Sequence, residues 1–131
     1  MIGIDTNVLV RYLAQDDAKQ SAQASRFVGE LSADAPGFIS LVTLVELVWV
    51  MQGPYAASRK EIAAILGLLL RTEELVIENV EVVFAALRVF ESSKAGFADC
   101  LIERSAARAG CTHTVSFDQA AIKTAGMRSL T

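Results

Sequence analysis

The first thirteen residues, MIGIDTNVLVRYL, constrain the fold more than any other stretch of the chain. Residues 1–4 form a short apolar run that ends at Asp5, as a buried strand would. The apolar residues at positions 8, 9, 12 and 13 then share one face of a helix, and Thr6 and Asn7 are residue types that cap helices. The pattern predicts a strand, then Asp5, then a helix. Asp5 would lie at the carboxyl end of the strand, where α/β proteins bind ligands; the alternative is that it only caps the helix.

Strands and helices alternate along the rest of the chain. A Ser58–Glu61 capping box precedes one apolar helical stripe, and Asn79 is a candidate cap for the next helix. Alternation of this kind predicts an α/β protein with a largely parallel sheet between layers of helices. No repeat or linker interrupts the pattern, so we expect one domain over residues 1–131. The predicted helices cover residues 6–13, 18–31, 41–52, 58–70, 79–90, 97–108 and 118–125, and the predicted strands cover residues 1–4, 37–40, 75–77, 112–116 and 127–130.

Composition limits the environment and the partners. With 12 basic and 15 acidic residues the net charge is −3, so nucleic acid can be attracted only by local basic patches. Cys100 and Cys111 form no CxxC pair and no disulfide framework, which is typical of a reducing compartment. No signal-peptide pattern follows Met1, and the densest apolar run, residues 38–51, contains Glu46 and is too short to span a bilayer. We therefore expect a cytoplasmic protein without a membrane partner.

Four of the 15 acidic residues have strongly apolar sequence neighbours. Asp5 follows a strand, Glu46 lies in the middle of a helix, Asp99 lies in the first turn of a helix, and Asp118 follows the fourth strand. The other eleven fall at turns, helix ends or polar faces, where solvation accounts for them. A carboxylate against apolar groups must be hydrogen-bonded, paired, protonated or bound to a cation. Unrelated caps and core acids are the competing interpretation of the four.

The residue types of this set favour a hard cation. Carboxylate oxygens are ligands of Mg²⁺ or Mn²⁺ rather than of Zn²⁺. His113 is the one histidine and forms no zinc-binding motif with the two cysteines, which argues against a structural zinc site. A cluster of carboxylates at one sheet edge would hold a divalent ion that activates water and neutralises a phosphate.

The four acids lie in segments that resemble the motifs of the PIN-domain nucleases, and most closely those of VapC-type toxins of type II toxin–antitoxin systems. The resemblance covers residues 2–130, with the motifs in the order found in that family. The motif segments are Asp5-Thr-Asn-Val-Leu-Val, Leu44-Val-Glu46-Leu-Val-Trp49, Phe97-Ala-Asp99-Cys-Leu-Ile102 and Val115-Ser-Phe-Asp118.

This resemblance implies a three-layer α/β/α fold with a five-stranded parallel sheet of order 3-2-1-4-5. It also implies an endoribonuclease that depends on Mg²⁺ or Mn²⁺ and cleaves structured RNA, such as tRNA or a ribosomal RNA loop. Its partners would be a VapB-type antitoxin and a second copy of the chain. Asp5, Glu46 and Asp99 match the family's metal-site acids, and Asp118 matches a more variable fourth acid. Thr6, Asn7 and Ser116 match positions whose polar side chains support the site.

Substrate binding would require local bases. Arg11, on the helix that follows Asp5, is the strongest candidate, ahead of Arg59-Lys60, Lys94 and Arg104; the competing interpretation is a solvated or ion-paired side chain. Trp49 and Tyr55, with the apolar stripe 62–70, are candidates for an antitoxin groove or dimer face, or for core packing. Tyr12 and Phe97 could stack on bases but fit the core better.

Two rival classes of function compete with this interpretation: another α/β protein with an Asp after its first strand, and a non-enzymatic module. A phosphohydrolase of the haloacid-dehalogenase type needs a second Asp where Asn7 stands, and a phosphorelay receiver needs an acidic pair and a late lysine that the sequence lacks. A catalytically inactive PIN-like module that binds RNA or protein is the remaining alternative, and the presence of all four acids argues against it.

Overall fold

A computed structural model describes all 131 residues, and seven helices and five strands form two compact units. The first unit covers Met1–Glu78 and the second Asn79–Thr131. The elements of the first unit are β1 (Ile2–Gly3), α1 (Thr6–Ala14), α2 (Ala18–Glu30), β2 (Gly37–Ile39), α3 (Leu41–Gln52), α4 (Arg59–Arg71) and β3 (Leu75–Ile77). Those of the second are α5 (Val80–Ser92), α6 (Phe97–Arg108), β4 (Val115–Ser116), α7 (Gln119–Thr124) and β5 (Arg128–Ser129). No helix combines the length and the apolar character needed to cross a membrane.

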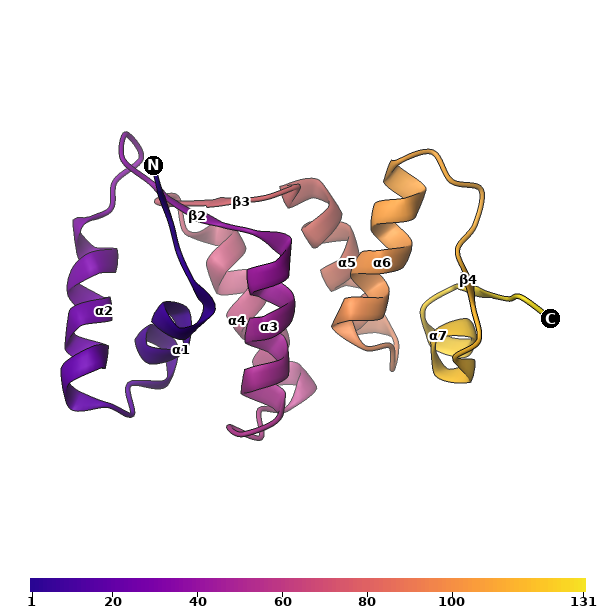
Figure 1. The fold of residues 1–131 in the computed structure, drawn as a ribbon, viewed down its shortest axis with the longest axis horizontal. Coiled ribbons are helices and arrows are strands. Elements are labelled where there is room, and N and C mark those ends of the chain that lie inside the picture. Colours follow the sequence, from indigo (N-terminus) through magenta and orange to yellow (C-terminus); the bar gives the residue numbers. More distant parts are fainter. The chain divides into compact units, whose positions relative to one another are not determined.

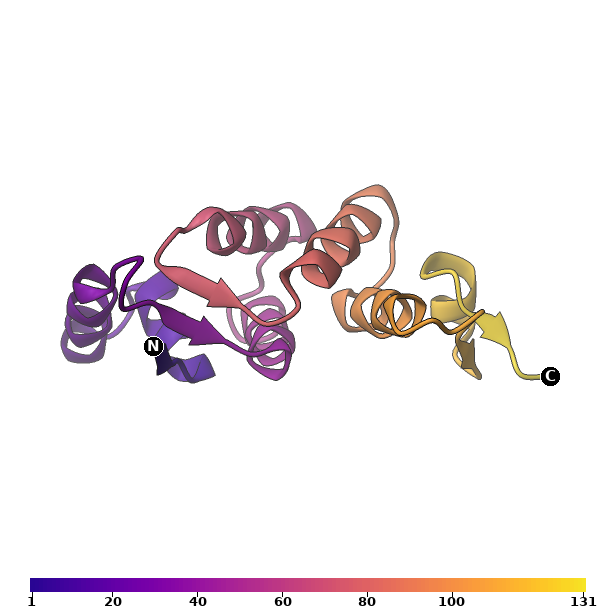
Figure 2. The same ribbon diagram turned by 90° about the horizontal axis from the view of Figure 1, so that it is seen from above.

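The first unit contains a parallel three-stranded sheet of order β1-β2-β3 (Figures 1 and 2). Ile2 is paired with Gly37, and Phe38 with Val76. In this unit α1 packs against both α2 and α3, and α4 packs against α3 and β3. The fully buried side chains include Leu9 on α1, Ile39 on β2 and Leu47 on α3, which join these elements into one core.

The second unit contains the parallel pair β4–β5 and the closely packed helices α5 and α6 (Figure 1). Phe90 of α5 and Phe97 of α6 are buried and meet edge to face, with ring centroids 6.1 Å apart. The prediction that Phe97 belongs to the core is therefore confirmed.

The predicted mixed α/β architecture with parallel strands is confirmed. The predicted bounds of the helices at 41–52 and 97–108 and of the strand at 75–77 match α3, α6 and β3. The pairings β1-β2-β3 and β4-β5 agree with the order 3-2-1-4-5, and a single five-stranded sheet stays a prediction. The strands predicted at 112–116 and 127–130 are only two residues long, because pairing is limited to Val115–Arg128 and Ser116–Ser129.

Two predicted helix caps have different outcomes. Around α4, the Ser58 hydroxyl accepts from the Glu61 N–H at 3.1 Å and the Glu61 carboxylate accepts from the Ser58 N–H at 3.0 Å, so the capping box is confirmed. Asn79 precedes α5 as predicted, but its side chain caps nothing. Its backbone is left-handed, with φ of 49°, a conformation that asparagine tolerates better than most residues. Asn79 is therefore selected for a backbone turn and not for a capping side chain.

Candidate active site

Asp5 follows β1 and occupies the N-cap position of α1, with extended backbone dihedrals. Its side chain makes no capping hydrogen bond. The competing interpretation is thus correct about the position of Asp5, but the side chain makes no capping hydrogen bond that would account for it. The carboxylate is exposed at the carboxyl end of a parallel strand, as predicted.

Glu46 is connected to the start of α1 by a hydrogen bond. The Thr6 hydroxyl donates to Oε1 of Glu46 at 2.7 Å, which joins α1 to α3 across 40 residues of sequence. Thr6 is buried, at 9% exposure, whereas Glu46 is exposed. One oxygen of Glu46 is thus oriented by a side chain that directly follows Asp5 in the sequence.

Asp99 and Asp118 are brought together in the second unit. Asp99 lies in the first turn of α6, and burial, followed by the negative charge of Asp118, raises its pKa above the ordinary value. Asp118 is the N-cap of α7, and its Oδ1 accepts from the Ala120 N–H at 2.9 Å. The Ser116 hydroxyl in turn accepts from the Asp118 N–H at 2.9 Å. Burial and the negative charge of Asp118 thus both disfavour ionisation of Asp99 in the folded chain.

The burial expected of the four acids is wrong for three of them. Asp5, Glu46 and Asp118 are exposed, and only Asp99 is partly buried. The reason is visible at α3, where Leu47 and Val48 enter the core while Glu46 and Trp49 face outward. Val42 and Trp49 are exposed like Glu46, so apolar sequence neighbours did not show that this acid is buried. Within neither unit do three or more Asp, Glu, His or Cys side chains come together, so one cluster of all four acids stays a prediction.

Arg11 is held by three neighbours at the end of α1. Its Nε donates to Gln20 at 2.8 Å, and its Nη1 lies 3.1 Å from Oδ1 of Asp16 and 3.2 Å from the Tyr55 hydroxyl. The Tyr55 hydroxyl donates to Oδ2 of Asp16 at 2.6 Å, and this bond, followed by the charge and hydrogen bonding of Arg11, holds the pKa of Asp16 below its ordinary value. Nη2 of Arg11 is not part of these bonds.

The remaining candidates for substrate or partner binding differ in burial and in pairing. Arg104 pairs with Glu103 through two hydrogen bonds, of 2.6 and 3.0 Å, and Glu103 is only 14% exposed, so the solvated surface expected for Glu103 is wrong. Of the stripe 62–70, Ile62, Leu66 and Leu69 belong to the core. Trp49, by contrast, is 61% exposed.

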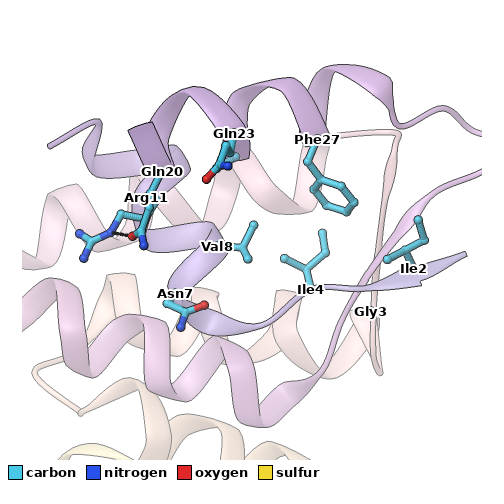
Figure 3. Close-up of a pocket in the computed structure, with 10 residues that line it drawn as sticks. Ile2, Gly3, Ile4, Asn7, Val8, Arg11, Gln20, Gln23 and Phe27 are labelled. Carbon is cyan, nitrogen blue, oxygen red and sulfur yellow. Dashed lines mark hydrogen bonds between the residues drawn. The ribbon is translucent and has the colours of Figure 1, made fainter. Parts of the chain in front are cut away.

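A pocket of about 410 Å³ that was not predicted lies between α2 and the segment formed by β1 and α1 (Figure 3). Its apolar wall is formed by Ile2, Ile4, Val8, Ala24 and Phe27. Its polar residues are Asn7, Arg11, Gln20 and Gln23. Gln20 and Gln23 lie on the same helical face as Ala24 and Phe27, but they were missed because a glutamine on a helix is usually solvated, and their approach to α1 depends on how the helices pack. The spacing of three residues between them was the one available signal.

Comparison with known proteins agrees with this arrangement. The sequence model of the PIN domain matches residues 2–127. A VapC ribonuclease of Aquifex aeolicus (strain VF5) is 26% identical over 115 residues, which cover 87% of this chain and 84% of that protein. With parallel strands, an unengaged carboxylate after the first strand and a family match over nearly its whole length, the chain belongs to the PIN domain family.

Proposed function

We propose that this protein is an endoribonuclease that depends on Mg²⁺ or Mn²⁺ and acts as the toxin of a toxin–antitoxin pair. The observation that carries the proposal is the carboxylate of Asp5, which stands at the end of β1 and caps no helix. The similarity to a VapC ribonuclease supports the same activity. Its substrate would be structured RNA, such as tRNA or a ribosomal RNA loop, and it would act in the cytoplasm.

The donor atoms fit a hard divalent cation. The four acids offer only carboxylate oxygens, and neither the histidine nor a cysteine is needed to complete the set. The pKa of Asp99, raised by burial and by Asp118, indicates repulsion that a bound cation would relieve. In this proposal Asp5, Glu46, Asp99 and Asp118 are the metal-binding and catalytic residues of one site.

Each supporting residue has a role that follows from its contacts. Thr6 orients Glu46 by its hydrogen bond of 2.7 Å, and Ser116 fixes the backbone at Asp118. Asn7, in the first turn of α1, presents an amide to the same region. A bound Mg²⁺ or Mn²⁺ would lower the pKa of a coordinated water and stabilise charge on the scissile phosphate. Arg11 would use Nη2 to bind an RNA phosphate while Asp16 and Tyr55 hold Nη1 and Gln20 holds Nε.

The proposed protein partners are a VapB-type antitoxin and a second copy of the chain. Trp49 and Val42 are 61% and 69% exposed on α3, and large exposed apolar side chains of this kind favour a protein interface. The order of events would be antitoxin release followed by RNA binding at the acids.

Cleavage of total tRNA and ribosomal RNA by antitoxin-free protein tests the proposal. We expect discrete fragments with Mg²⁺ or Mn²⁺, none with EDTA, and none from a folded Asp5→Asn variant. Asp34→Asn, an exposed turn acid in the same unit, is the matched control and should cleave normally. If the folded protein binds RNA but neither binds Mn²⁺ nor cleaves, it is an inactive PIN-fold binding module and the nuclease proposal is wrong.

A further inference from the structure

The pocket beside α1 differs in charge from the rest of the chain. None of its ten lining residues is acidic, although the protein has 15 acidic side chains and a net charge of −3. Arg11 is its one charged residue. The lining itself therefore presents no carboxylate to a phosphate. Asp16 is paired with Nη1 of Arg11 at 3.1 Å, which leaves Nη2 as the group available to a phosphate-bearing ligand.

One wall of the pocket suits a flat apolar surface. Phe27 of α2 lies opposite Ile4, which follows β1, and Val8 of α1, as Figure 3 shows, and Ile4 is itself only 5% exposed. The volume of about 410 Å³ lies within the range of small-ligand sites. A nucleobase has two apolar faces, and stacking against an aromatic ring is the usual way in which proteins hold an unpaired one.

The other side of the pocket offers neutral hydrogen-bonding groups. Asn7 and Gln23 make no side-chain hydrogen bond in the structure, so their amides retain both donor and acceptor capacity. Gln20 uses its oxygen to accept from Arg11 and retains its NH₂ donors. Amide groups pair with the donor and acceptor edge of a base. An apolar peptide side chain would match the wall but would leave these three amides without partners.

The pocket also lies next to two of the proposed metal-site acids. Asn7 is separated from Asp5 only by Thr6, whose hydroxyl holds Glu46. A nucleotide with its base in the pocket would thus have its backbone close to the start of α1. We propose that this pocket holds one unpaired nucleobase of the RNA, next to the phosphate that is cleaved. This inference rests on the proposed nuclease function and specifies its substrate as RNA with an unstacked base at the cut.

Binding can be measured without any cleavage. Side-chain amide signals in ¹⁵N NMR spectra would be followed in EDTA during titration with AMP, GMP, CMP and UMP, and with ribose 5-phosphate as the control for phosphate alone. We expect at least one nucleotide to shift the signals of Gln20 and Gln23 while Gln52, an exposed glutamine on α3, is unmoved. An apolar peptide is titrated in parallel. The proposal is overturned if no nucleotide shifts the Gln20 and Gln23 signals, if ribose 5-phosphate shifts these signals equally, or if only the apolar peptide shifts them.

Cleavage kinetics provide the second test. A series of RNA substrates would each carry one abasic nucleotide, at a different position around the cut. We expect kcat/KM to fall by about tenfold or more at a single position, where the missing base can no longer occupy the pocket. Gln23→Ala should lower kcat/KM on the intact substrate, because the base loses its hydrogen bond to the Gln23 amide. The further loss of kcat/KM caused by the abasic nucleotide should then be smaller than in the parent protein. Gln52→Ala is the matched control and should behave as the parent protein.

The outcomes separate the two proposals. If Asp5→Asn abolishes cleavage while every abasic substrate is cut at the parental rate, the pocket assignment is wrong and the nuclease stands. If nucleotides shift Gln20 and Gln23 but no RNA is cleaved with metal present, the base pocket stands and the nuclease proposal fails.

Discussion

Thr6 connects Asp5 and Glu46, the two candidate metal-binding acids of the first unit. Its buried hydroxyl donates to the exposed carboxylate of Glu46 at 2.7 Å, and its backbone directly follows Asp5. A buried hydroxyl without a partner is costly, so this bond serves both the fold and the orientation of Glu46. The same contact can therefore be tested for stability and for metal binding.

Replacing Thr6 by Val should separate these effects. Loss of the hydroxyl should lower the free energy of unfolding by about 1 kcal/mol. It should also weaken Mn²⁺ binding by about tenfold or more, because groups that orient a ligand typically matter by that amount. Thr6→Ser keeps the donor and should recover most of the affinity. Calorimetric Mn²⁺ titration and urea denaturation measure the two quantities; equal Mn²⁺ affinity for parent and Thr6→Val would contradict the orienting role.

Asp99 should destabilise the metal-free protein at neutral pH. Its pKa is raised in the folded state by burial and by the charge of Asp118, so folding favours the protonated form. That stabilisation is present below the pKa of the unfolded state and is lost as the pH rises through the raised folded value. At pH 7 in EDTA, Asp99→Asn should therefore have a higher Tm than the parent, and the difference should vanish in acid. With Mn²⁺ the order should reverse; a lower Tm for Asp99→Asn in EDTA would contradict this explanation.

At the scale of elements, α4 depends on local capping chemistry more than any other helix. Ser58 and Glu61 satisfy each other's backbone N–H groups, and hydrogen bonds from Ser58 hold the pKa of Glu61 below its ordinary value. Ser58→Ala should lower the free energy of unfolding by about 1 kcal/mol. The contribution of Glu61 is present above its unfolded pKa and is lost as the pH falls through its lowered folded value.

Urea denaturation at pH 7 and at pH 3 measures this prediction, with Glu61→Gln beside Ser58→Ala. The Glu61→Gln deficit should shrink at the lower pH, because the carboxylate of the parent is then neutralised. Ser32→Ala, in the turn after α2, controls for loss of a serine hydroxyl outside a helix cap. Identical deficits at both pH values would show that the charge of Glu61 contributes nothing.

The elements were predictable from sequence where local signals decide them. The length of the apolar run and the Gly53-Pro54 stop predicted α3, Gly110 predicted where α6 ends, and the Ser58–Glu61 pattern predicted the start of α4. Asn79 shows where such signals are ambiguous, because asparagine suits both a side-chain cap and a left-handed turn. The outward direction of Glu46 and the pocket beside Phe27 were not predictable, since each depends on which faces of distant helices pack together.

At the scale of the whole molecule, the four acids proposed to bind metal are divided between the two compact units. Asp5 and Glu46 belong to residues 1–78, whereas Asp99 and Asp118 belong to residues 79–131. If one site uses all four acids, then Mn²⁺ binds only when both units contribute, and binding must stabilise both. If each pair of acids binds metal on its own, Mn²⁺ would stabilise each unit independently of the other.

Hydrogen exchange of the full chain distinguishes these cases. With Mn²⁺ we expect slower exchange in α1 and α3 of the first unit and in α6 of the second, because a ligand that binds only the complete site protects every element that supplies it. Asp118→Asn should then reduce protection in α1 as well as in α6, although residue 118 belongs to the second unit. Asp34→Asn is the matched control and should keep the parental pattern. If Asp118→Asn alters exchange in α6 alone, the acids work as two separate pairs. A single metal centre built from all four acids would then be wrong, even for a protein that cleaves RNA.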